Sequence, residues 1–464
     1  MTMDQSRRAF IKRASALSIA GSATPFVMNL AAMGEAAAAT ATDYKALVCV
    51  FLYGGNDYGN TLPPYDNARH AFYTSQRQGF ALNQAALAAT VLNPSTALPN
   101  GAQYALAPGL APLLPIFNAG RMAVMLNVGT LVQPTTKAQY TARSVPLPPK
   151  LLSHNDQQSY WQASSPEGAA TGWGGRIGDL LQSGNGNAAL TCINPSGNAV
   201  FLTGRAAVQY SVSTTGPIAL NARNTLNGSS AAATMLRQLI ANPGGTHDFQ
   251  VAHGDIGRRA LSLFDLVSTS LASAPATTTA FPAAADPSSS LGAQLQMVAK
   301  LISVSQELGA KRQVFFVSTG RFDTHDGLGA LHPLLMQNVG NAMRAFYDAT
   351  VELGIANKVN TFTGSDFGRA MTANNDGTDH GWGSMHFALG GAVNGRRFYG
   401  TNPTLASNGP DDIGQGRLLP TMSVDQYGAT LASWFGVPAG ELATVFPNIN
   451  NYAGSTLGTN LGFV

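Results

Sequence analysis

The chain of 464 residues is long enough for one large domain or two ordinary ones and can bury a substantial core. Charged residues make up only 11% of it, and its formal net charge is +3. A nearly neutral chain without runs of Lys or Arg lacks the basic surface that nucleic acid requires, so we expect no nucleic-acid partner.

The N-terminal segment has the pattern of an export signal. The residues SRRAFIK at 6–12 precede a mildly apolar, Ala-rich stretch with a small-residue cleavage option, ATA, at 39–41. We therefore predict a twin-arginine signal peptide at residues 1–41, the twin-arginine translocase as partner during export, and a periplasmic or secreted location. A retained anchor is the alternative, but polar residues and Pro25 interrupt the apolar run, so we expect no stable membrane span after cleavage.

Apolar runs in the next part of the chain predict an alternation of strands and helices. The expected elements are a strand at 46–53, a short helix at 107–118 and a strand at 122–128. The Pro/Thr-rich stretch 131–149 predicts a long surface loop. Ser153 follows this loop and precedes a helix, either as its N-cap or as an exposed hydroxyl in a site.

Residues 190–290 are mixed in pattern, and we predict a cap or insertion there. The region contains the strand-like runs LTCIN and AVFLTG, two helical stretches, and a low-complexity segment at 273–290 that we expect to be disordered or loosely packed. Cys192 in LTCIN and Cys49 in the first strand are the only cysteines of the chain. Because both lie in apolar runs, we expect two buried free thiols rather than a disulfide.

From Leu291 onward the pattern is more regular. Apolar residues recur at helical spacing and Gly309 closes that helix; a strand at 313–318, a helix at 333–353 and a strand at 359–363 follow. The handedness of such β-α-β units makes the two strands parallel, with their following loops at the same edge. MHFALGGAV predicts a further strand, and the segment from Val424 to Phe435 a last helix. We therefore expect residues 42–464 to form a single α/β domain.

Three carboxylates, Asp57, Asp323 and Asp366, each follow one of the predicted strands. The carboxyl ends of parallel strands meet at one edge of a sheet, where ligands bind. Acidic groups gathered there repel each other unless a cation, a proton or a basic partner joins them. The sequence therefore predicts a metal-assisted site.

Histidines lie close to these carboxylates in the sequence, in FDTHDG and DHGWGSMH. His325 and His380 are the next candidate metal ligands, and His386 is a further one, although it follows a strand-like run and could be a core residue. A His/Asp cluster can bind a divalent metal such as zinc, calcium, magnesium or manganese. His332, before Pro333, is expected to be a capping or turn residue instead.

Three further residues are candidates for the chemistry itself. His154 could be a ligand, a base or a surface group, and Ser153 could be a nucleophile if a metal or base activated its hydroxyl. Arg369 could pair with an anionic substrate or neutralise the neighbouring carboxylates.

A resemblance follows from an ordered run of motifs. GGNDYGNT, NVGTL, SHNDQQSYW, TGWGGR, TGRFDTHD, SDFGR and DHGWGSMH resemble one family of twin-arginine-exported bacterial proteins, the domain of unknown function fifteen hundred and one. That family is similar to the alkaline phosphatase and sulfatase superfamily. The resemblance implies a three-layer α/β/α sandwich with a mainly parallel central sheet and a two-metal hydrolase site.

The resemblance also implies roles for single residues. Asp57, Asp323 and Asp366 resemble the metal carboxylates, His380 or His386 resembles the late metal histidine, and Ser153 stands roughly where the nucleophile does. The chain departs from the phosphatase pattern at two positions that hold histidine there, where it has Gly327 and Phe367. A single metal site fits these residues better than two complete ones.

Taken together, the sequence predicts an exported metal-dependent hydrolase that acts on a phosphate or sulfate ester, in a small anionic ester or a polymer. Ser153 or a metal-bound water would attack, and Arg369 would hold the anion. The alternative is a non-catalytic periplasmic binding or assembly protein on a degenerate scaffold of the same kind.

Overall fold

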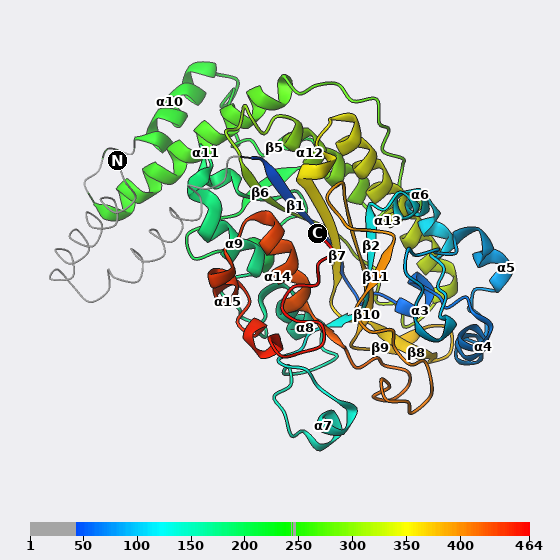
Figure 1. The fold of residues 1–464 in the computed structure, drawn as a ribbon. Coiled ribbons are helices and arrows are strands. Elements are labelled where there is room, and N and C mark those ends of the chain that lie inside the picture. The colour runs from blue at the N-terminus through cyan, green and yellow to red at the C-terminus, as the bar shows by residue number, and fades with distance from the viewer. Residues whose placement is uncertain (1–42, 243, 245–246) are drawn as a thin grey trace.

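The computed structural model describes residues 43–242, 244 and 247–464, so the predicted signal peptide at 1–41 lies outside the described residues. The described chain is an α/β protein built on a mixed sheet of ten strands (Figure 1). The strand order is β11-β2-β10-β7-β1-β6-β3-β4-β5, and β12 pairs with β2.

The strands and helices have the following bounds. The strands of the large sheet are β1 Lys45–Leu52, β2 Met122–Gly129, β3 Cys192–Asn194, β4 Tyr210–Ser213, β5 Gly216–Pro217, β6 Arg312–Thr319, β7 Val359–Ser365, β10 Ser384–Gly390, β11 Arg397–Tyr399 and β12 Met422–Ser423. A separate hairpin consists of β8 Arg369–Ala373 and β9 Thr378–His380. The α-helices are α3 Tyr58–Thr61, α4 Asn67–Gln76, α5 Gln84–Leu87, α6 Leu114–Asn118, α7 Lys137–Ala142, α8 His154–Ala163, α9 Trp173–Leu181, α10 Ser230–Ala241, α11 Asp248–Ala272, α12 Leu291–Ser303, α13 Leu328–Glu352, α14 Val424–Phe435 and α15 Leu442–Val445.

The centre of the sheet brings three strand ends to one edge. β1 pairs in parallel with β6 on one side and with β7 on the other, and Leu52 at its end is level with Thr319 and Ser365. β10 runs antiparallel to β7, so it begins at the edge where those three strands end. The predicted parallel arrangement of the strands at 313–318 and 359–363 is therefore confirmed, with β1 inserted between them.

Both faces of the sheet are buried, as the near-continuous apolar run of β1 predicts for a central strand. Alternate residues of β1 enter two different hydrophobic cores: Val48 and Val50 pack with residues of α12 and α13, whereas Leu47 and Phe51 pack with residues of α9 and α14. Cys49 and Cys192 are free and buried, as expected.

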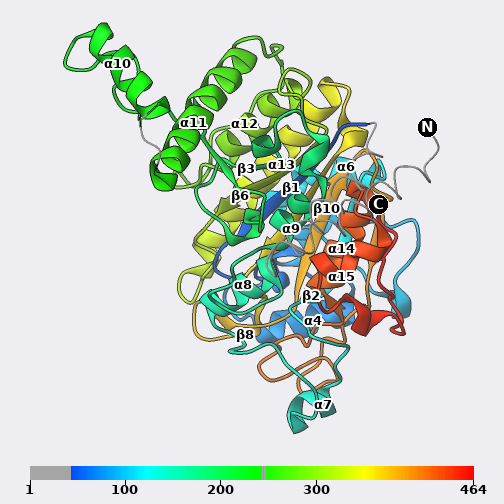
Figure 2. The same ribbon diagram turned by 90° about the vertical axis from the view of Figure 1, so that its left-hand side faces the viewer.

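The region 190–290 divides into parts that belong to the sheet and parts that do not. β3, β4 and β5 extend the large sheet beyond β6, while α10 and α11 form a pair that projects from that end of the molecule (Figure 2). The run AVFLTG forms a single 3-10 turn at Val200–Leu202 rather than a strand. Packing accounts for the turn. The rings of Phe201 and Trp173 meet edge-on with their centroids 4.5 Å apart, and residues of this segment lie against the glycines at the start of α9.

The low-complexity segment 273–290, expected to be disordered or loosely packed, is mostly exposed but is held against α13 by hydrogen bonds. The hydroxyls and backbone amides of Thr278 and Thr279 donate to Glu352, and the backbone amides of Ala285 and Asp286 donate to Asn338. These polar contacts and the packing of Ala274 and Phe281 against the core hold the segment in place.

The helix α13 begins five residues earlier than the pattern predicts. Its backbone continues back to Leu328, so that Pro333 lies inside the helix. His332 is consequently not a capping or turn residue but a buried residue of the helix, 2% exposed, and burial lowers its pKa to about 4.

No helix of the described residues is long and apolar enough to cross a membrane.

A glycine lets two of the strand ends approach each other. Gly54 follows β1 with φ +119, and a Cβ atom there would lie 2.2 Å from the backbone nitrogen of Asp323. Only glycine fits both this backbone conformation and this distance. Gly54 therefore fixes where the loop after β6 can lie.

The substitution Gly54→Ala should be compared with Gly197→Ala. Gly197 has nearly the same φ, +118, but no atom within 4 Å of its Cβ position, so its replacement should cost only the backbone strain of roughly 1–2 kcal/mol. Gly54→Ala adds a steric clash and should lower the free energy of unfolding by at least about 2 kcal/mol more. Denaturant unfolding of both variants measures the difference; equal losses would contradict the close approach.

Candidate metal centre

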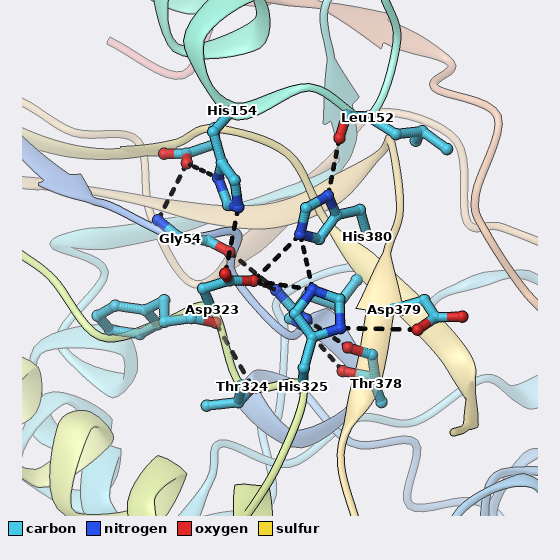
Figure 3. A network of polar contacts seen from close by, with 12 residues as sticks. Gly54, Leu152, His154, Asp323, Thr324, His325, Thr378, Asp379 and His380 are labelled. Carbon is cyan, nitrogen blue, oxygen red and sulfur yellow. Dashed lines mark hydrogen bonds and ion pairs between the residues drawn. The ribbon is translucent and has the colours of Figure 1, made fainter. Parts of the chain in front are cut away.

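The candidate site lies at the edge where β1, β6 and β7 end. Asp323 and His325 follow β6, His380 is the last residue of β9, and His154 is the first residue of α8 (Figure 3). Asp366 directly follows β7. These side chains come from segments up to 226 residues apart, the separation of His154 and His380, and the shared strand ends bring them together.

The carboxylate of Asp323 is the centre of the group. Its Oδ1 lies 3.1 Å from His380 Nε2 and 3.2 Å from His325 Nε2, and its Oδ2 lies 3.3 Å from His154 Nε2. We call His154, His325, His380 and Asp323 the histidine cluster. All three imidazoles present Nε2 to the same carboxylate.

A second carboxylate orients His154 from behind. Nδ1 of His154 donates to Oδ2 of Asp366 over 2.7 Å, and the same oxygen accepts from Gln158 and from the backbone nitrogen of Gly54. Because the Nδ1 proton points to Asp366, a neutral His154 has its Nε2 lone pair facing Asp323. Histidines that bind metals in proteins are commonly oriented in this way by a carboxylate.

A backbone carbonyl orients His380 in the same way. Nδ1 of His380 lies 2.7 Å from the carbonyl oxygen of Leu152, which can only accept, so this nitrogen carries the proton. Leu152 has φ +72, a left-handed conformation that turns its carbonyl toward the ring. His380 therefore also presents a lone pair at Nε2, toward Asp323.

His325 completes the cluster. Its Nε2 lies 2.9 Å from Nε2 of His380, and its Nδ1 lies 3.6 Å from the carboxylate of Asp379. The three imidazoles thus have one arrangement in common. Each has Nε2 turned inward, but only His154 and His380 have an acceptor within hydrogen-bond distance of Nδ1.

This arrangement calls for a cation. Lone pairs on His154 and His380 and a carboxylate between them repel each other unless a proton or a metal ion joins them. The hydrogen bond to Asp366 raises the pKa of His154, whereas burial lowers the pKa of His380. The His154, Asp323 and His380 ligand atoms all lie within 4.8 Å of one another.

The separations also suit a metal ion. The Nε2 atoms of His154, His325 and His380 lie 3.1 to 3.3 Å from oxygens of Asp323. Ligand atoms about 2.0–2.1 Å from a tetrahedral zinc stand roughly 3.3 Å apart. The residues present therefore fit a single metal ion with imidazole and carboxylate ligands.

Arg369 lies beneath the cluster rather than facing a substrate. Its guanidinium is fully buried and donates to Asp323 Oδ1 over 2.8 Å, to the Gly54 carbonyl, and to the hydroxyl and carbonyl of Thr378. Burial alone would raise the pKa of Asp323, but the hydrogen bond and charge of Arg369 lower it below its ordinary value. Of the two roles considered, the geometry matches neutralisation of the carboxylate.

The structure does not bring Asp57 to the cluster. Asp57 caps α3 and forms a two-pronged ion pair with Arg77, with both N···O distances at 2.5 Å and both side chains fully buried. Burial alone would raise the pKa of Asp57, but the charge and hydrogen bonds of Arg77 lower it. Asp57 already has its cation and is not available as a ligand here.

His386 and Ser153 also point elsewhere. His386 lies in β10 within the sheet, edge-on to Trp161 at 5.0 Å, and burial lowers its pKa to about 3. Ser153 is the N-cap residue of α8, and its hydroxyl donates to Asp156 over 3.1 Å. Neither side chain is hydrogen-bonded to the histidine cluster.

Sequence reasoning missed the groups that orient the imidazoles. Gln158 could have been found as the residue four positions after His154, on the same side of a helix. Asp379 stood beside His380 in the motif but had no assigned partner. The role of the Leu152 carbonyl could not be predicted from the sequence, because every residue has a backbone carbonyl oxygen.

The chain can now be compared with known proteins. A family model described as "Protein of unknown function (DUF1501)" matches residues 44–426. The chain belongs to this family. The span that matches the DUF1501 family contains every residue of the histidine cluster together with Asp366.

The other comparisons add little. No curated protein matches the chain. Among solved structures, one described as "Crystal structure of Ps i-CgsB in complex with k-i-k-neocarrahexaose" is similar over 88% of this chain and 77% of its own, with 9% identity and a TM-score of 0.33. At that TM-score the likeness supports no conclusion about this member of the DUF1501 family.

Replacing Asp57 with Asn tests whether this carboxylate is structural. Arg77 would remain buried without its counter-charge, so the free energy of unfolding should fall by about 3–5 kcal/mol. The metal content per folded molecule should stay that of the wild type. Denaturant unfolding and elemental analysis measure the two quantities. Asp323→Asn should lose the metal, although it also leaves a buried guanidinium, that of Arg369, without its counter-charge. Loss of metal from Asp57→Asn would contradict the assignment.

Replacing Asp366 with Asn tests the orientation of His154. The amide can still accept from His154 Nδ1, but it lacks the negative charge, so metal affinity should fall by about 10–100-fold without being lost. His154→Ala removes the ligand itself and should lower the affinity further. Competition with a chelator of known affinity measures both. Unchanged affinity in Asp366→Asn would show that Asp366 does not support the site.

Proposed function

We propose that the histidine cluster holds one divalent metal ion and that the protein is an exported, metal-dependent hydrolase of phosphate or sulfate esters. The observation that carries the proposal is the convergence of three imidazole Nε2 atoms on one carboxylate, each within 3.3 Å of Asp323. Such an arrangement is strained without a cation and satisfied with one. It also leaves the cluster open, since the Asp323 and His325 side chains are 43% and 41% exposed.

The donor set narrows the choice of metal. Calcium and magnesium take oxygen ligands almost exclusively, whereas zinc and manganese accept imidazole. Zinc and manganese therefore fit this cluster best among the four ions considered. One site also fits better than two, because Asp57 is paired with Arg77 and His386 lies in the core.

When bound, such an ion would polarise an ester oxygen and lower the pKa of a water molecule. The residues of the chain would hold and orient it: Asp323 supplies the charge, and Asp366 and the Leu152 carbonyl fix the rings of His154 and His380. The Ser153 hydroxyl is bonded to Asp156, so water is the better candidate for the attacking group.

The proposal also includes a finer description of the fold and a route of export, and each is supported by a different feature of the chain. The finer fold, a three-layer α/β/α sandwich of the alkaline-phosphatase type, is supported by the two cores on opposite faces of the sheet. Export through the twin-arginine pathway to the periplasm or the medium is supported by SRRAFIK at residues 6–12.

A non-catalytic binding or assembly protein is the second candidate. It is favoured by the position of Arg369, whose guanidinium donates to Asp323, Gly54 and Thr378 and is fully buried. A hydrolase of anionic esters would gain from a free cation beside the metal ion, and Arg369 does not supply one.

The test is to compare wild type with Asp323→Ala for metal content and for hydrolysis of 4-nitrophenyl phosphate and 4-nitrophenyl sulfate. Wild type should carry about one metal ion per chain and hydrolyse at least one ester, and the variant should lose both. Ile218→Asp, an exposed site far from the cluster, is the matched control and should behave as wild type. Bound metal without any hydrolysis above the variant would favour the second candidate, and absence of metal from wild type would refute the proposal.

A further inference from the structure

The helix pair α10 and α11 carries an uncovered apolar surface. Half of the ten large apolar side chains that are exposed in the described chain lie on these two helices, namely Met235, Leu239, Phe249, Val251 and Ile256. The pair projects from the end of the molecule at which β5 closes the sheet (Figure 2). Because exposed apolar side chains that gather in one place mark interaction sites, this pair is a candidate docking surface.

On α11 the exposed apolar residues form a stripe along one face of the helix. Phe249, Ala252 and Ile256 follow one another at spacings of three and four residues, which place them on the same face. All three are exposed, Phe249 by 81% and Ile256 by 59%. A different face of α11 packs against α10, where a Cβ atom at Gly257 would lie 2.5 Å from the side chain of Ile240. The stripe therefore remains available to another molecule.

Two opposite charges lie at the two ends of one flank of this stripe. Asp248 and Arg259 are eleven residues apart, so they lie on the same side of α11 but about 16 Å from each other. Neither makes a hydrogen bond or ion pair with another of the described residues, whereas Arg258 is paired with Asp255. The helix is too rigid for Asp248 and Arg259 of one chain to meet.

A second copy of the chain complements both the stripe and the charges. If two α11 helices pack antiparallel about a twofold axis beside Ala252, Phe249 of each copy lies opposite Ile256 of the other. The same arrangement brings Asp248 of each copy within about one helical turn of Arg259 of the other, so the attractive pair forms twice. An anionic membrane surface would cover the stripe as well, but it would repel Asp248. The charges thus favour a second copy.

We propose that the stripe on α11 is the interface of a homodimer in which the two α11 helices pack antiparallel. The inference is independent of the proposed function, because the helix pair contains no residue of the histidine cluster. One helix from each copy makes a contact at the small end of specific interfaces, so we expect a dissociation constant in the micromolar range.

The first test is sedimentation equilibrium of the full chain, which should show a monomer–dimer equilibrium. Ile256→Asp places a carboxylate in the stripe and should raise the dissociation constant at least about tenfold. Val351→Asp, at an apolar residue of α13 that is 51% exposed, is the matched control and should dimerise as wild type does. Wild type that stays monomeric up to about 100 μM, or equal behaviour of the two variants, overturns the inference.

A charge exchange tests the antiparallel packing. Asp248→Lys and Arg259→Glu each bring like charges together and should raise the dissociation constant at least about threefold. The double variant restores attraction between the copies and should return to within about twofold of wild type. Recovery of this kind supports the arrangement. Two weakened single variants whose combination stays as weak overturn it.

A cross-link tests which residues lie at the twofold axis. Ala252→Cys should form a disulfide-linked dimer on mild oxidation, since equivalent residues beside the axis face each other. Ser262→Cys, also exposed on α11 but off the stripe, should not, and the two cysteines of the chain itself are buried. Equal cross-linking of both variants overturns the packing. Monomeric wild type that binds vesicles of anionic phospholipid, with binding lost in Ile256→Asp, would assign the stripe to a membrane surface and overturn the dimer.

Discussion

The site depends on one carboxylate that is shared by four basic groups. Asp323 receives Arg369 from below and faces three imidazoles on its open side. The buried guanidinium keeps the carboxylate ionised, as the lowered pKa of Asp323 indicates. An ionised Asp323 repels the lone pairs of the inward-facing imidazoles, so any affinity of the cluster for a metal ion would depend on Arg369 as well as on the candidate ligands.

The direction of the strands explains why these residues meet. β1, β6 and β7 end level with each other, and β10 begins at the same edge because it runs the other way. The hairpin of β8 and β9 fills the chain between the end of β7 and the start of β10, and it returns His380 to the edge. If all strands ran in the same direction, β10 would begin at the opposite edge from the end of β7, and the short β8–β9 hairpin could not connect them. The mixed sheet thus contributes directly to the cluster.

The apolar runs and the positions of the strand ends were enough to predict most of the central strands and part of the candidate site. Asp323 and Asp366 lie where β-α-β handedness predicts them, and the histidine-rich segments at 325 and 380 join them. Asp57 follows its strand as predicted, but Arg77, at the end of α4, pairs with it. No local pattern reveals that pairing, because it depends on how a helix packs. His386 shows the same limit: the alternation along β10 turns it into the sheet core, toward Trp161.

The three carboxylates at the strand ends, Asp57, Asp366 and Asp323, differ in how they are paired. Asp57 has a dedicated guanidinium and two short bonds, and it lies out of solvent. Asp366 has three donors on one oxygen, while its other oxygen is buried without a partner among the described residues. Asp323 is 43% exposed and faces nitrogen lone pairs. Of these three acids only Asp323 is exposed, and one side of it stays open beyond its ion pair with Arg369.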